Sequence, residues 1–175
     1  MREAFQEAKA TKNMHSRVGY VAFYTKCLIA NKQYKPAEQY AETFLKVYKK
    51  EIFKYRWHIF FSAYLESLLF QTKFDKLVSV IRKYKLNDKD KKYTEKAVYL
   101  PNIPWYAAIA EYKESRNGLD KISQRMLKDT EILLQNRDKT RPLEELLDEL
   151  RPLIPDVFNR VFAIAKDPVI KNLFR

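Results

Sequence analysis

The chain has 175 residues, of which 46% are hydrophobic and 32% are charged, and its formal net charge is +12. This supply of apolar and aromatic side chains suffices for a folded core and excludes an intrinsically disordered composition. Glycine occurs only at Gly19 and Gly118, which disfavours an all-β protein with many tight turns and excludes a glycine-rich phosphate loop. We therefore expect an all-α protein.

Helical periodicity begins close to the N-terminus. A weakly amphipathic segment spans residues 3–10, and a longer one spans 15–30, where Tyr20 and Phe23 broaden the apolar stripe. The next helix is expected to begin at Pro36, because proline suits the first turn of a helix. Further segments of helical periodicity follow at 52–70, which is the most hydrophobic, and at 74–84.

A charged connector over residues 85–103 interrupts this rhythm. Pro104 then predicts the first turn of another helix, and Gly118 is expected just after its end, because glycine tolerates the left-handed conformation of a helix stop. Asp167 is expected to cap the last helix. The remaining helical segments lie at 119–134, 143–150, 157–164 and 168–174.

Three junctions between these segments share one pattern: KQYKPA at 32–37, TKFDKL at 72–77 and NGLDKI at 117–122. In each junction a polar pair precedes a large apolar residue, and a second apolar residue follows three positions later. The large residues, Tyr34, Phe74 and Leu119, lie 40 and 45 residues apart. Each junction joins two long helical segments, which predicts a helical hairpin that the chain uses three times.

We expect the large residue of each junction to wedge between the two antiparallel helices of its hairpin. The residue three positions later lies on the same face and is expected to pack against the first helix. One hairpin cannot bury its own apolar stripe, so neighbouring hairpins must stack. An irregular helical bundle whose stripes happen to pair is the alternative architecture.

This pattern resembles the tetratricopeptide repeat, whose second helix opens with an aromatic residue followed three positions later by alanine. Tyr34 and Ala37 match that signature, and the other two junctions match in residue type. The resemblance covers residues 15–135. It implies a right-handed α-solenoid of stacked antiparallel hairpins, followed by C-terminal capping helices. The units implied are three hairpins within 1–135, at about 15–50, 52–86 and 104–135, and the capping helices at 136–175.

The resemblance also implies a function. In this family the first helix of each hairpin lines a concave groove that receives an extended or helical peptide from another protein. We therefore expect a non-catalytic interaction module or scaffold that binds a protein or peptide partner; an acidic protein surface explains the positive net charge as well as nucleic acid does. The positions implied to face the groove are Ala22, Lys26, Ile29, Ser62, Glu66, Leu69, Ala107, Glu111 and Glu114.

Side chains suited to catalysis or metal binding do not cluster in the sequence. His15 and His58 lack partners at ligand spacing, and Cys27, the single cysteine, is interpreted as a small buried hydrophobe. Four carboxylates lie in EELLDEL at 144–150, but a charged run between prolines is typical of a solvated helix face rather than of an enclosed catalytic pair. We expect no enzymatic activity, no metal and no cofactor.

Positive charge is concentrated between Lys46 and Lys96, where fourteen Lys and Arg residues face six Asp and Glu residues, an excess of +8. Basic residues interleaved with aromatic rings are what nucleic-acid binding uses, so a basic helical nucleic-acid-binding protein is the alternative function. Tyr48 and Trp57 in this region also lie on stripes that a core would bury. The contact residues of the alternative are Lys49, Lys50, Lys54, Arg82, Lys83 and Lys85.

The lack of a membrane-spanning segment and of a secretion signal predicts where the protein is located. No apolar run approaches the roughly 20 residues of a membrane span, and the N-terminal segment MREAFQEAKATKN lacks the apolar core of a secretion signal. We therefore expect a cytoplasmic protein without a membrane span.

Overall fold

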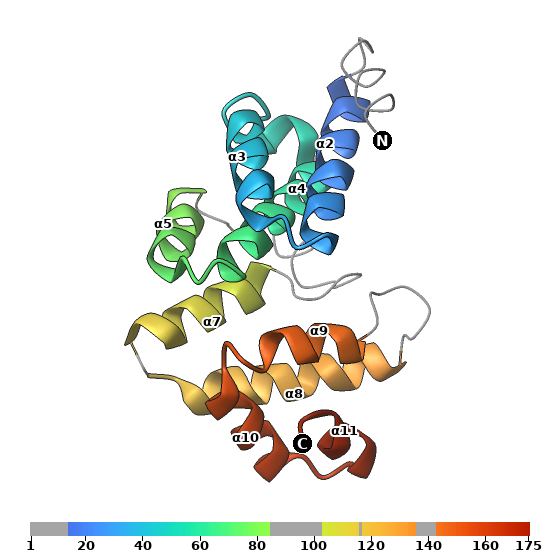
Figure 1. The fold of residues 1–175 in the computed structure, drawn as a ribbon, viewed down its shortest axis with the longest axis vertical. Coiled ribbons are helices and arrows are strands. Elements are labelled where there is room, and N and C mark those ends of the chain that lie inside the picture. Colours follow the sequence, from blue (N-terminus) through green and yellow to red (C-terminus); the bar gives the residue numbers. More distant parts are fainter. Residues whose placement is uncertain (1–13, 85–102, 116, 136–142) are drawn as a thin grey trace.

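The computed structural model describes residues 14–84, 103–115, 117–135 and 143–175, and these residues form nine α-helices and no strand (Figure 1). The all-α class expected from the composition is thus confirmed for this part of the chain. The helices are α2 (Met14–Ala30), α3 (Tyr34–Leu45), α4 (Lys50–Leu69), α5 (Phe74–Tyr84), α7 (Ile103–Ser115), α8 (Leu119–Gln135), α9 (Leu143–Leu150), α10 (Pro155–Ile164) and α11 (Pro168–Leu173).

Most helix boundaries follow the predicted ones within two residues. The helix expected from Pro36 begins two residues earlier, at Tyr34. Asp167 caps α11 as expected, because its Oδ1 atom accepts a hydrogen bond of 2.7 Å from the Val169 amide. The helix predicted at 3–10 and most of the connector predicted at 85–103 lie outside the described residues.

The turns before α3 and α5 have the same conformation. The residues two positions before Tyr34 and Phe74 are Lys32 and Thr72, and both have a φ of 56°. In each turn this residue's amide donates to the carbonyl three positions back, and the next amide donates to the carbonyl five positions back. These are the hydrogen bonds of a Schellman helix stop, formed here by residues other than glycine. Before α8 the left-handed residue is Gly118, with a φ of 84°.

The helices that these turns connect pack as pairs, α2 on α3, α4 on α5 and α7 on α8. Each pair also contacts the next one: α4 packs on α2 and α3, and α7 packs on α4 and α5. At the C-terminal end, α10 and α11 pack on α8 (Figure 1). From α2 to α8, described helices that follow one another in sequence therefore also pack on one another.

The three residues predicted to pack against the first helix of each pair, Ala37, Leu77 and Ile122, are all buried. The large junction residues also reach toward the following pair. The Tyr34 ring stacks on Phe70, just after α4, with centroids 5.2 Å apart, and the Lys113 ammonium of α7 lies 5.6 Å from the centre of the Phe74 ring. These junction residues therefore contribute to packing between pairs as well as within them.

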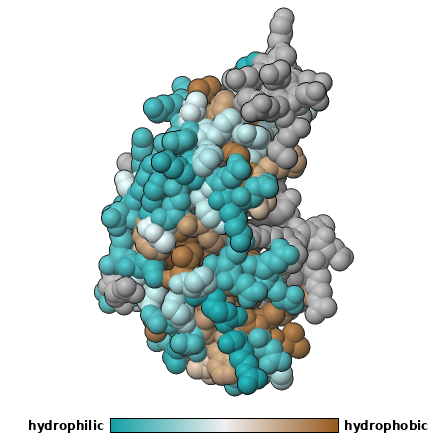
Figure 2. Space-filling view, in the orientation of Figure 1, coloured by the Kyte–Doolittle hydropathy of each residue, from teal (hydrophilic) through white to brown (hydrophobic). Residues whose placement is uncertain are grey.

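The centre of the core is aromatic. Trp57 is fully buried, stacks on Phe61 with ring centroids 4.6 Å apart, and contacts the Tyr84 ring. Its indole nitrogen donates a hydrogen bond of 3.1 Å to the carbonyl of Tyr48, so burial leaves this polar atom satisfied. The outer surface in this orientation is mostly hydrophilic, with smaller hydrophobic patches (Figure 2).

The length and apolar character of a helix decide whether it can cross a lipid bilayer. None of the described helices is both long enough and apolar enough to cross a membrane. The predicted absence of a membrane span therefore holds for the part of the chain that the structure describes.

Candidate partner-binding pocket

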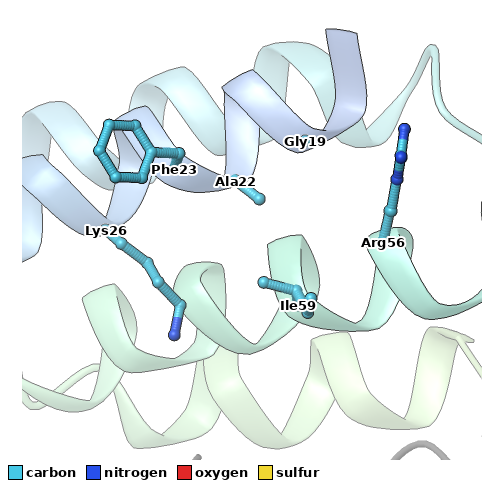
Figure 3. A pocket seen from close by; sticks show the side chains of 6 residues that line it. All are labelled: Gly19, Ala22, Phe23, Lys26, Arg56 and Ile59. Carbon is cyan, nitrogen blue, oxygen red and sulfur yellow. The ribbon is translucent and has the colours of Figure 1, made fainter. Parts of the chain in front are cut away.

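A pocket with a volume of about 220 Å³ lies between α2 and α4 (Figure 3). α2 contributes four of its lining residues and α4 contributes two. The lining residues are Gly19, Ala22, Phe23, Lys26, Arg56 and Ile59. Two of them, Ala22 and Lys26, are among the residues implied to face a binding groove.

Small side chains on α2 create this hollow. α2 is one of the helices that pack on α4, but at the pocket it presents Gly19 and Ala22, which are too short to fill the space above Ile59. A Cβ atom built on Gly19 would meet no atom within 4 Å. Gly19 is therefore not required by a close approach of the two helices, and its lack of a side chain leaves room that a partner can occupy.

The two helices run in the same direction past the pocket. In Figure 3 the residues of α2 succeed one another in the same sense as Arg56 and Ile59 of α4. Arg56 and Lys26 consequently lie toward opposite ends of the pocket, with Ala22 and Ile59 between them (Figure 3). The result is a short apolar floor with one cation near each end.

An exposed aromatic ring stands beside this floor. Phe23 is 66% exposed, and Tyr20, on the same helix, is 45% exposed. Periodicity predicted that both rings broaden the buried stripe of α2, and this prediction is wrong. The buried residues of the helix include Val18, Val21 and Ala22, and one residue further along turns the side chain by about 100°, so that Phe23 lies outside the stripe.

The other residues implied to face the groove differ in accessibility. Ala22, Ile29 and Leu69 are all buried in the core. Of these three, only Ala22 lines the pocket, so the side chains of Ile29 and Leu69 are not presented to a partner in this structure. Glu66 is also buried, and its Oε2 atom lies 3.4 Å from the hydroxyl of Tyr106, which donates to it across the α4–α7 contact. Ser62 and Ala107 are half-buried, whereas Glu111 and Glu114 are exposed.

Sequence reasoning missed four of the pocket residues, Gly19, Phe23, Arg56 and Ile59. The signal that could have found Gly19 is spacing. Gly19 precedes Ala22 and Lys26 by three and seven positions, which places all three on one helix face. Arg56 and Ile59 had no comparable signal, because their position opposite α2 depends on how the helices cross.

The residues of the alternative, basic surface are only partly described. Lys49, Arg82 and Lys83 are exposed, while Lys85 and the side chains of Lys50 and Lys54 lie outside the described part. The rings that would stack on bases in this region, Tyr48 and Trp57, are buried. Base stacking requires accessible ring faces, so these two residues offer no support for the nucleic-acid hypothesis.

A second polar site joins α3 to the start of α5. The Glu38 side chain is 5% exposed, and its oxygens accept hydrogen bonds from Lys73 at 2.5 Å, Lys76 at 2.6 Å and Gln71 at 2.8 Å. Glu42 is bonded to Lys76 at 2.6 Å and accepts from the Tyr64 hydroxyl at 2.9 Å. Each carboxylate therefore has donors within the protein.

These contacts control the titration of the site. Burial raises the pKa of the Glu38 carboxyl, but the hydrogen bonds from Lys73, Lys76 and Gln71 more than offset it, so its pKa lies below the ordinary value. The same balance, with Lys76 and Tyr64 as donors, lowers the pKa of Glu42. Both groups are held in the charged form, which suits a structural ion-pair network rather than proton transfer.

The remaining side chains of types used in catalysis or metal binding include His58, Cys27 and the carboxylates at 144–150. His58 is buried, and its ring lies edge-on to Trp57 at 5.2 Å. Cys27 is half-buried rather than fully buried as expected. In the run at 144–150 the carboxylates of Glu144, Glu145 and Asp148 are exposed, as predicted for a solvated helix face. Within the described residues, no three His, Cys, Asp or Glu side chains form a group suited to a metal ion.

Comparison of the chain with models of known families, with curated proteins and with solved structures finds no significant match. The resemblance to tetratricopeptide repeats consequently stays a prediction from the sequence pattern. Function is therefore inferred from the geometry of the pocket and its charges.

Proposed function

We propose that this protein is a non-catalytic interaction module that binds a segment of another protein in the pocket between α2 and α4. The observation that carries this proposal is the unfilled pocket over the half-buried Ile59, beside the exposed ring of Phe23. Apolar surface that is both concave and accessible is the feature that marks binding sites on soluble proteins.

The order of helix packing supports the proposal. In a stack of hairpins each unit contacts its neighbours, and the first helices of successive units lie next to one another. The contacts of α4 with α2 and of α7 with α4 fit that arrangement. On this proposal, the pocket lies between the first helices of units one and two. The packing of α10 and α11 on α8 fits a C-terminal cap.

The size of the pocket favours a protein segment over a small molecule. Its volume of about 220 Å³ is below the roughly 300–1,000 Å³ of typical sites for small-molecule ligands. It suits one large apolar side chain, which is how an anchor residue of a peptide or helix is bound in a groove.

Filling the pocket tests the proposal. Peptides are selected from a displayed random library on the wild-type protein, and their affinities are measured for the wild type, Gly19→Trp and Gly19→Ala. Gly19→Trp places a ring in the pocket, whereas Gly19→Ala leaves most of it open and favours the helix. We expect Gly19→Trp to weaken binding at least about tenfold and Gly19→Ala to change it little.

Circular dichroism and thermal unfolding of both variants serve as fold controls. A selection whose peptides all bind Gly19→Trp as well as the wild type, while that variant remains folded, would overturn the proposal. A peptide that loses binding to Gly19→Trp and to Phe23→Ala supports it, because the two changes alter the floor and the wall of the same pocket.

A further inference from the structure

We propose that the segment bound in the α2–α4 pocket is acidic, with one large apolar anchor that has carboxylates on both sides. This inference depends on the proposed function and adds the chemistry of the partner. It is carried by the positions of Lys26 and Arg56 at opposite ends of an apolar floor (Figure 3).

The charges at the pocket have one sign. Its lining contains two cations and no carboxylate. Arg56 is exposed and forms no ion pair with any described residue. An anchor side chain that displaces water from Ile59 lowers the local dielectric constant, which strengthens attraction between the nearby cations and carboxylates on the partner.

A second copy of this chain is a poor occupant, because each copy carries a net charge of +12. Two such molecules repel one another at long range, and their association is slowed. A segment with an excess of carboxylates is attracted by the same field. Charge complementarity therefore selects a different, acidic protein over self-association.

Nucleic acid is also disfavoured at this site. The two cations of the pocket can neutralise about two phosphates, whereas typical specific protein–DNA contacts involve about 6–10. The floor between them is a small apolar hollow made by Ala22 and Ile59, which suits an aliphatic or aromatic anchor. We therefore assign the two cations to carboxylates.

The test uses blocked peptides with a central phenylalanine whose flanking residues are all Glu, all Gln or all Lys, with binding measured by fluorescence anisotropy at low and high salt. We expect the Glu peptide to bind the wild type about tenfold more tightly than the Gln peptide at low salt. The difference should shrink at high salt, and the Lys peptide should bind most weakly.

Charge reversal supplies the decisive comparison. In the double variant Lys26→Glu with Arg56→Glu, we expect the preference for Glu flanks to be lost and the Lys peptide to bind best. The matched control is Lys121→Glu with Lys128→Glu, two exposed positions of α8 that give the same change in net charge. This control should keep the preference, because it changes the charge at a distance from the pocket.

Each remaining outcome has a defined meaning. Equal affinities for Glu and Gln peptides, both lost in Gly19→Trp, would overturn the acidic partner and leave the proposed function standing. Peptides that bind regardless of Gly19→Trp would overturn both. A single-stranded oligonucleotide that displaces the Glu peptide and loses its own binding in the Lys26→Glu, Arg56→Glu variant would overturn the acidic partner, because those cations would then serve phosphates.

Discussion

The first two helix pairs have two contrasting contact regions, one between α2 and α4 and the other where α3 meets the start of α5. At the second, the carboxylates of Glu38 and Glu42 are bonded to Lys73, Lys76 and Gln71. At the first, small residues leave a pocket, and the exposed guanidinium of Arg56 lies at its rim. The comparison teaches that charge serves different purposes in the two places. Paired charges hold helices together, whereas the Arg56 guanidinium beside the pocket forms no ion pair with a described residue.

The largest expected effect comes from removing the centre of the paired network. Glu38→Ala removes one acceptor from two lysines and an amide, and we expect a loss of roughly 2 kcal/mol in the free energy of unfolding. The loss is limited because the lysines are partly solvated, Lys76 keeps Glu42, and the Gln71 amide keeps the carbonyls of Tyr34 and Ser67. Urea denaturation gives this value. Glu42→Ala is the matched control with a smaller expected loss, since the Glu42 side chain is 41% exposed. Equal and negligible losses for both variants would show that the network is not structural.

The next effect is a dependence of stability on pH. The pKa values of Glu38 and Glu42 are lower in the folded protein than their ordinary value, which is about 4.3. Their stabilisation is therefore complete above that value and is lost as the pH falls below it through the folded pKa values. We expect the urea midpoint to fall more steeply below about pH 5 in the wild type than in Glu38→Gln. Parallel pH profiles of the two proteins would contradict the assignment.

A smaller effect of opposite sign is expected at the two helix stops. Lys32 and Thr72 adopt a φ of 56°, a left-handed conformation that costs residues with a Cβ atom about 1 kcal/mol more than glycine. Thr72→Gly should therefore raise the free energy of unfolding by roughly 0.5–1 kcal/mol, and Lys32→Gly should do the same. Gln33→Gly is the control, because Gln33 has a φ of −88°, and it should not stabilise. Thermal unfolding distinguishes these outcomes.

The smallest effect on stability is expected at the pocket. Phe23 is 66% exposed, so we expect Phe23→Ala to change the free energy of unfolding by less than about 0.5 kcal/mol, while it weakens peptide binding. A large loss of stability would identify the ring as part of the core and would remove the contrast between the two regions. Thermal unfolding and the anisotropy measurement on the same sample provide both readouts.

Much of the fold could be predicted because helical periodicity is local. Tyr34, Phe74 and Leu119 were located at the junctions from a short pattern, and each is the first residue of a helix. The prediction that Phe23 belongs to the buried stripe of α2 is wrong because periodicity is only a local pattern. The width of the buried apolar face of a helix depends on which helices pack against it. The sequence pattern therefore does not show where the buried face ends. The start of α3 at Tyr34 rather than Pro36 is a difference of the size expected at helix ends.

The candidate site could be predicted less well. Ala22 and Lys26 line the pocket as implied by their positions on the first helix, whereas Ile29, Glu66 and Leu69 are buried away from it. The predicted stacking of hairpins assigns these residues to one helix face. It does not specify how closely the next helix approaches that face. Arg56 and Ile59 became part of the site only because α4 crosses α2 at that level.

The sequence by itself determined the all-α class, the positions of most helices and the junctions between them, because these depend on residues within a few turns of one another. Tertiary structure alone decided which charges are paired. Glu38 meets Gln71, Lys73 and Lys76 across 33, 35 and 38 residues, and no local pattern distinguishes those lysines from Arg56, whose guanidinium forms no ion pair with a described residue. The physical reason is that side chains far apart in the chain are brought within bonding distance, or left beside an open pocket, only by the way in which the helices pack.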